Sequence, residues 1–197
     1  MEINENRSQG RQIRTINTDF RVREDNDDLI IEGYFAVFGD IYELWPGATE
    51  SIDRHAFDTQ IGADVRALID HHTELVLGRT TAGTLVLAPD DHGLFGRIRI
   101  NREDSDAMNQ YARVKRRDVT QCSFGFDIGE ERMDVREDGS VHWTILRVDP
   151  LYEVSICTFP AYTATGVEAR RKEFDTIKRR TEVWRTKQLE RMKNIWH

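Results

Sequence analysis

Apolar and polar residues alternate along much of the first hundred residues, and this two-residue period is typical of β-strands. Strands are expected over residues 13–22, 29–38, 64–71, 84–87 and 94–100. The first two strands flank the turn-forming sequence EDNDD, and the last two flank PDDHG. The pattern therefore predicts two hairpins in the first half of the chain.

Helical signals are fewer than strand signals. Ser51 can cap a short helix that runs to Asp58, and residues 39–48 before it form a predicted loop that contains Trp-Pro-Gly. Residues 105–118 cluster apolar side chains at helical spacing and end in Lys-Arg-Arg, which suits a helix C-terminus. One longer helix is thus predicted in the middle of the chain.

Two more strands are expected, over residues 120–128 and 141–159. Strands do not alternate regularly with helices, which argues against a doubly wound parallel sheet. The pattern favours a β-rich α+β fold with a mostly antiparallel sheet or barrel and attached helices.

The C-terminal residues differ from the rest in charge. The chain has 28 Lys and Arg against 35 Asp and Glu, yet residues 166–197 hold ten bases and only five acids. Apolar residues recur there at roughly helical spacing: Val167, Phe174, Ile177, Trp184, Met192 and Ile195. We predict a disordered segment 1–12, a folded domain 13–165 and a basic amphipathic helical tail 166–197. Its apolar stripe can pack on the domain, on a second copy or on a partner helix.

Several classes of protein are excluded by what the sequence lacks. Its polar opening has no signal-peptide core, and no run of about 18 apolar residues could span a membrane. Acidic residues are interspersed among the basic residues of the tail, which argues against nucleic-acid binding. Cys122 and Cys157 are too few for a disulfide framework, and neither metal-ligand spacing nor a nucleotide-binding glycine motif occurs. We expect no metal and no cofactor.

Residues 120–128 separate into two faces if they form a strand. Cys122, Phe124 and Phe126 then share the apolar face, while Ser123 and Gly125 share the other. Gly125 would leave room beside the Ser123 hydroxyl for a substrate backbone. A plain solvent-facing serine fits the same pattern, whereas a cysteine among aromatic side chains is usually inert.

Glu153 stands in an otherwise apolar strand, where a carboxylate requires a partner such as an imidazole or guanidinium, unless that face is solvated. His71 and His72 stand at the end of a predicted strand, and either could act as a general base. Strand parity does not choose between them.

Six segments in register resemble the prohead (capsid maturation) proteases of tailed bacteriophages, over roughly residues 30–165. They are Glu32–Phe38, Glu50–Phe57, Leu68–His71 with Leu77–Arg79, Gly83–Leu85, Arg117–Phe126, and Leu151–Ser155 with Thr158–Tyr162. The resemblance implies a serine endopeptidase with the fold of the herpesvirus assembly proteases, a β-barrel ringed by helices.

The resemblance also implies roles for three residues. Ser123 matches the family nucleophile, His71 matches the family histidine before Leu-Gly-Arg, and Glu153 takes the third, orienting position. The implied substrates are the scaffolding segment of the major capsid protein and the protease itself, inside the immature capsid in the host cytoplasm. The tail is a candidate for docking, self-association or self-cleavage. The alternative is a non-enzymatic capsid-assembly factor that retains the protease fold.

Overall fold

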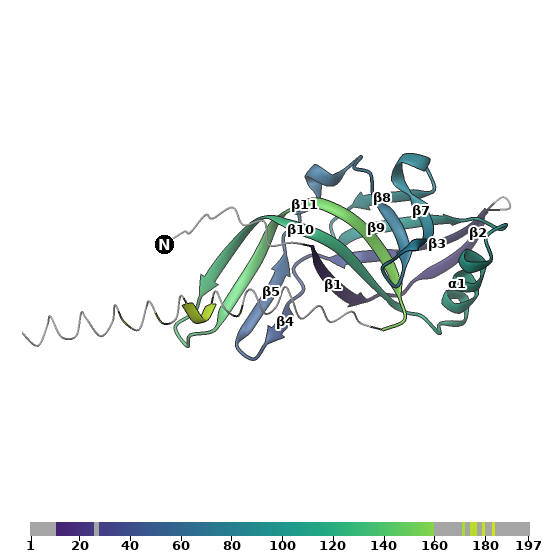
Figure 1. Ribbon diagram of the computed structural model, residues 1–197. Helices are drawn as coiled ribbons and strands as arrows, with labels where there is room; N and C mark the ends of the chain where they lie inside the picture. Colours follow the sequence, from purple (N-terminus) through teal and green to yellow (C-terminus); the bar gives the residue numbers. More distant parts are fainter. Residues whose placement is uncertain are drawn as a thin grey trace, which may run out of the picture. The chain divides into compact units, whose positions relative to one another are not determined.

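The computed structural model describes residues 11–25 and 28–159 and, nearer the C-terminus, residues 171, 174–176, 179 and 183. Chain packing divides the protein into two units, Met1–Tyr162 and Thr163–His197. The first unit is rich in β-strands, as the alternating pattern predicted (Figure 1). Most of the predicted tail lies outside the described residues; the six described there are helical.

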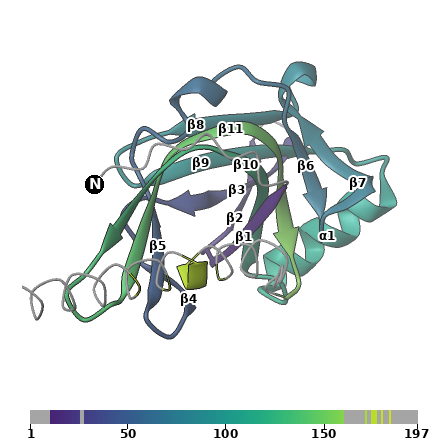
Figure 2. The same cartoon turned by 60° about the vertical axis from the view of Figure 1, so that its left-hand side comes forward.

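The strands of the first unit form two sheets. The seven-stranded sheet has the order β1-β10-β11-β5-β4, with β6 pairing β11 and β7 pairing β6. It consists of β1 (Gln12–Asn17), β4 (Tyr42–Trp45), β5 (Ala48–Ile52), β6 (Arg66–Ile69), β7 (His72–Arg79), β10 (Gln121–Val135) and β11 (Val141–Cys157). Most of its pairings are antiparallel, but β5 and β6 each run parallel to β11. Figure 2 shows β6 and β7 beside the end of β11.

The second sheet is four-stranded, in the order β2-β3-β9-β8. Its strands are β2 (Arg21–Asp25), β3 (Asp28–Val37), β8 (Leu85–Pro89) and β9 (Gly93–Ile100). Both predicted hairpins, β2 with β3 and β8 with β9, are confirmed by antiparallel pairing. Pairings among the described strands leave both sheets open, so the β-barrel implied by the resemblance is not confirmed there.

Helices are few within residues 28–159. The predicted central helix is α1 (Ser105–Arg116), which the Asp104 side chain caps by accepting from the backbone N–H groups of Asp106 and Ala107. Two short 3₁₀ helices, η1 (Asp58–Gln60) and η2 (Thr80–Ala82), complete this part of the chain. Helices therefore do not ring the sheets in this range.

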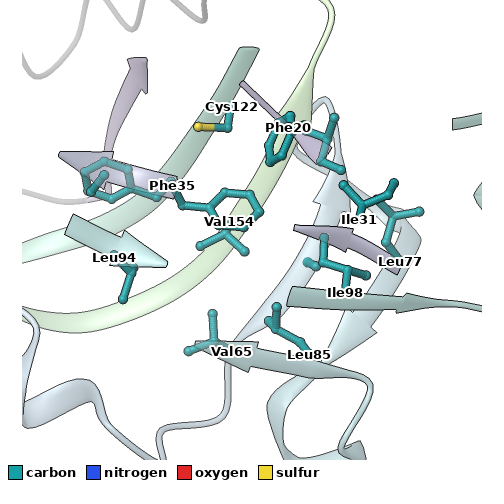
Figure 3. Packing of buried hydrophobic residues seen from close by; sticks show 14 of the residues in the cluster. Phe20, Ile31, Phe35, Val65, Leu77, Leu85, Leu94, Ile98, Cys122 and Val154 are labelled. Carbon is teal, nitrogen blue, oxygen red and sulfur yellow. The ribbon is translucent and has the colours of Figure 1, made fainter. Parts of the chain in front are cut away.

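Apolar side chains of the two sheets form one core (Figure 3). Cys122 and Val154 extend from β10 and β11 toward Phe35 and Ile98 of the other sheet. Phe124 and Phe126, on the Cys122 face of β10, are fully buried and stack with ring centroids 4.8 Å apart. The predicted division of residues 120–128 into an apolar and a polar face is confirmed.

The predicted strand 13–22 is wrong as one element, because it breaks after Asn17. Its first part, β1, pairs with β10 in the larger sheet, and its second part, β2, pairs with β3 in the smaller sheet. Phe20 lies between the two parts, buried in the core against Phe35. Gln12, placed in the disordered segment by the sequence, begins β1 and is buried.

The short helix predicted from Ser51 to Asp58 is also wrong. Ser51 and Ile52 end strand β5, which runs parallel to β11 and is not recognisable from local sequence. The predicted loop 39–48 holds the whole of β4 and the start of β5, and the sequence pattern missed β7. Strand β5 is stabilised by β11, which is distant in sequence, whereas β4 pairs with its neighbour β5, and β7 with its neighbour β6, in hairpins that the sequence pattern did not reveal.

Candidate active site

A two-residue turn presents His71 to β11. Asp70 and His71 join β6 to β7, and both have positive φ, 47° and 63°, as a type I′ hairpin turn requires. The Asp70 N–H donates to the Ile156 carbonyl at 3.1 Å, and the Asp70 carboxylate accepts from the Thr158 N–H at 2.7 Å. These bonds tie the turn to β11 and its C-terminal end.

Glu153 receives the His71 side chain. Its Oε1 lies 2.8 Å from His71 Nδ1 and accepts from Arg11 Nη2 at 2.6 Å, while its Oε2 accepts from the Ser155 hydroxyl at 2.6 Å. Only 2% of Glu153 is exposed. The expectation that this carboxylate has an imidazole or guanidinium partner is confirmed, since it has both.

The charge of Glu153 follows from these contacts. Burial raises the pKa of Glu153, but the hydrogen bonds from His71, Ser155 and Arg11, together with the electrostatic interaction with His71, outweigh burial, so that its pKa lies below the ordinary value. Glu153 is therefore an anion at neutral pH, able to hold an imidazole by its Nδ1–H.

Ser123 lies on β10, directly across from Ser155 on β11. Its hydroxyl donates to the Arg14 carbonyl at 2.8 Å and accepts from the Thr15 hydroxyl at 3.3 Å. It is fully buried, so the reading of a solvent-facing serine is wrong. Among the described residues no hydrogen bond joins Ser123 to His71, although Ser155 contacts the His71 backbone and faces Ser123.

Gly125 pairs with Glu153, but the space it leaves is already filled. A Cβ atom on Gly125 would lie 2.4 Å from Glu153 Oε1 and 2.6 Å from Arg11 Nε. Gly125 thus lets Arg11 cross β10 to reach Glu153. The predicted opening for a substrate backbone is wrong.

Gly125→Ala is expected to lower by about 10–100-fold the rate of any reaction that depends on the His71–Glu153 pair, because the new methyl group must displace Arg11 or the Glu153 carboxylate, and ångström-scale misplacement of reacting groups is costly. Both displaced atoms end flexible side chains, so the fold should survive. Gly129→Ala is the matched control. Gly129 also lies on β10, and a Cβ atom there would contact Arg147 and Asp149 of β11 instead, so this variant should retain activity. Equal initial rates for the two variants would contradict this account.

The two adjacent histidines have different surroundings. His71 reaches the buried Glu153, whereas the His72 side chain is 59% exposed and lies 3.3 Å from the exposed Glu74. The turn separates these two histidines, which strand parity did not distinguish, because residue 71 occupies its second position and residue 72 begins β7.

Both cysteines are buried. Burial raises the pKa of Cys122 well above its usual value, and its thiol contacts the Tyr34 carbonyl in the core. Cys157 was not considered as a nucleophile from sequence, yet its Sγ lies 3.8 Å from His71 Nε2. Burial and the nearby Asp70 raise the pKa of Cys157 to about 12, so it is a neutral thiol at pH 7.

Sequence reasoning missed two residues that contact Glu153. Ser155 shares the strand face of Glu153 by parity, a signal that could have identified it. Arg11 falls in the segment predicted to be disordered, and no local pattern marked it. Within the described part of the chain, no group of three potential ligands is placed to hold a metal ion. No helix described there is long and apolar enough to cross a membrane.

Three comparisons with known proteins give matches. The family model of the caudovirus prohead serine proteases matches residues 17–180. The prohead protease of Enterobacteria phage HK97 is 30% identical over 176 residues, which cover 85% of this chain and 72% of that protein. The solved structure of the bacteriophage T4 capsid assembly protease aligns with 77% of this chain and 98% of its own, at 12% identity and a TM-score of 0.49.

Proposed function

Because the chain belongs to the caudovirus prohead serine protease family, we propose that it is a serine endopeptidase in which Ser123 is the nucleophile, His71 the general base and Glu153 the orienting carboxylate. The observation that carries this proposal is the buried hydrogen bond between His71 Nδ1 and Glu153, formed beside the strand that bears Ser123. A carboxylate that fixes one imidazole nitrogen leaves the other to exchange protons with a nucleophile.

The proposed reaction proceeds in two halves. Ser123 Oγ attacks the carbonyl carbon of the scissile peptide bond while His71 Nε2 takes the hydroxyl proton. The same nitrogen then protonates the leaving amine, and an acyl-enzyme ester remains on Ser123. A water molecule, deprotonated by His71, hydrolyses that ester. Throughout, Glu153 keeps the tautomer with a proton on Nδ1 and stabilises the imidazolium ion when it forms.

This reaction requires a change around Ser123. Its hydroxyl must leave the Arg14 carbonyl and turn toward His71 Nε2, a movement between staggered rotamers about the Cα–Cβ bond. Since Ser123 has no exposed surface, we expect substrate binding to open the face of the sheet above it.

A cysteine mechanism is the chemical alternative, because Cys157 Sγ lies within hydrogen-bonding reach of His71 Nε2, at 3.8 Å. Its pKa of about 12 disfavours the thiolate, and the family is described as one of serine proteases. Both observations support Ser123 over Cys157.

The proposed substrates are the scaffolding segment of the major capsid protein and the protease itself, within the immature capsid in the host cytoplasm. Membership of a prohead protease family supports capsid proteins as the substrate class. The competing function is an assembly factor without activity, which would keep the fold and need no reactive serine.

The test is the intact mass, over time, of the full-length protein together with its capsid protein assembled as a prohead. Wild type and Cys122→Ala are expected to produce fragments of the capsid protein, whereas Ser123→Ala should leave every chain whole. Fragments from Ser123→Ala but not from Cys157→Ala would transfer the nucleophile role to the cysteine. Intact chains in all samples, wild type included, would favour the assembly factor.

A further inference from the structure

We propose that Ser155 is a positioning residue that fixes His71 and Glu153 relative to each other. This inference rests on the proposed function of that pair. Ser155 is fully buried on β11, between the strand of Ser123 and the turn that carries His71. Its hydroxyl is bonded to both partners at once, to the backbone of one and the side chain of the other.

The direction of each hydrogen bond is set by chemistry. The His71 backbone N–H can only donate, so Ser155 Oγ accepts it, at 3.2 Å. The Glu153 carboxylate, whose pKa is lowered, can only accept when ionised, so the Ser155 hydroxyl proton points to Oε2, at 2.6 Å. Ser155 thus uses its one proton on Glu153.

These contacts close a ring. It runs from the His71 backbone through Ser155 to Glu153 Oε2, and returns from Oε1 to the His71 side chain at Nδ1. A carboxylate held at both oxygens cannot rotate without breaking a bond, and its orientation sets that of the imidazole. Ser155 therefore restricts the direction in which His71 Nε2 points.

The backbone of His71 gives the ring a second role. A non-glycine residue at φ 63° is strained and persists only where its surroundings hold it. Ser155 supplies the partner for the N–H of that residue. A buried hydroxyl at this position can hold both the turn and the carboxylate, whereas alanine can hold neither.

The test compares Ser155→Ala with Ser51→Ala in the full-length protein. Ser51 is the matched control, since its hydroxyl also lies on a strand of the same sheet and bonds a histidine, His142 Nε2 at 2.9 Å. For cleavage of the capsid protein, Ser155→Ala should lower kcat by about 10–100-fold with KM changed by less than about twofold, because only alignment of the reacting groups is lost. Ser51→Ala should retain both constants.

A spectroscopic measurement separates this inference from the proposed function. In protein labelled with ¹⁵N at histidine, the His71 Nδ1–H bonded to Glu153 should give a low-field proton resonance, assigned by its loss in His71→Gln. Ser155→Ala should shift or broaden that resonance, and Ser51→Ala should not. The resonance can be measured whether or not the wild type cleaves its capsid protein. A wild type without cleavage activity would therefore contradict the protease function but not the positioning role of Ser155.

Unchanged kcat and an unchanged resonance in Ser155→Ala would overturn the positioning role. If that variant fails to fold, Ser155→Cys takes its place, because a thiol keeps the shape and donates a weaker hydrogen bond. A Cys variant with wild-type kcat and resonance would equally refute the proposal, whereas Ser155→Thr, which keeps the hydroxyl, should recover activity toward that of wild type.

Discussion

Replacing Ser123 or His71 by alanine is expected to lower kcat by about 10⁶-fold each, and replacing both is expected to cost no more than either replacement alone. The reason is that, in the proposed mechanism, the two side chains act as one unit. A serine hydroxyl without a base is a weak nucleophile at neutral pH, and a base without a nucleophile has no proton to transfer.

The measurement is the initial rate of capsid-protein cleavage at saturating substrate for the two single variants and the double variant. His72→Ala is the matched control, because His72 is the adjacent histidine and is bonded only to the exposed Glu74 among the described contacts. Its rate should stay within about twofold of wild type. A double variant whose loss of rate equals the product of the two single losses, or an inactive His72→Ala variant, would contradict the roles proposed for Ser123 and His71.

The largest effect on stability is expected at Arg14, which is buried on β1. Its guanidinium donates to both carboxylate oxygens of the fully buried Glu50, and lies over the Phe126 ring at 5.7 Å. Arg14→Met should lower the free energy of unfolding by about 3–5 kcal/mol, since it leaves the Glu50 charge in the interior without the guanidinium.

Replacing both charges should be far less harmful than replacing one. In Arg14→Met with Glu50→Leu, no charge of the pair remains to be desolvated. Replacing a buried ion pair by apolar side chains often leaves the free energy of unfolding unchanged or raises it. We expect the double variant to lie within about 2 kcal/mol of wild type.

Urea denaturation of the full-length variants measures these differences, with the m-value checked for a constant unfolded state. Arg97→Met is the control, since Arg97 forms a 3.1 Å pair with Glu32 across two strands, but is itself half exposed. It should cost less than about 1 kcal/mol. An Arg14→Met variant as stable as Arg97→Met, or a double variant as unstable as Arg14→Met alone, would show that burial of the pair is unimportant.

Elements with local signals were predicted well from the sequence. Helix α1 carries its own cap at Asp104 and a basic last turn, and the β8–β9 hairpin carries its own turn residues. The two-residue period of β10 placed Cys122 in the core and Ser123 on the other face. Such signals act between residues close in sequence, so a single chain is sufficient to read them.

Long-range pairing decided two of the regions that were mispredicted. Strand β5 exists because it lies parallel to β11, and β1 separates from β2 because each pairs in a different sheet. No local period distinguishes a short strand with a distant partner from a loop or a helical turn.

The candidate site divides in the same way. The sequence by itself determined that Ser123 leaves the apolar face and that a glutamate at position 153, if buried, requires a guanidinium or imidazole partner. Only the tertiary structure decided that this partner is His71 rather than His72, that Arg11 joins it across Gly125, and that Ser155 links them. The physical reason is separation along the chain: the Arg11–Glu153 contact spans 142 residues, and only the strand register brings such residues together.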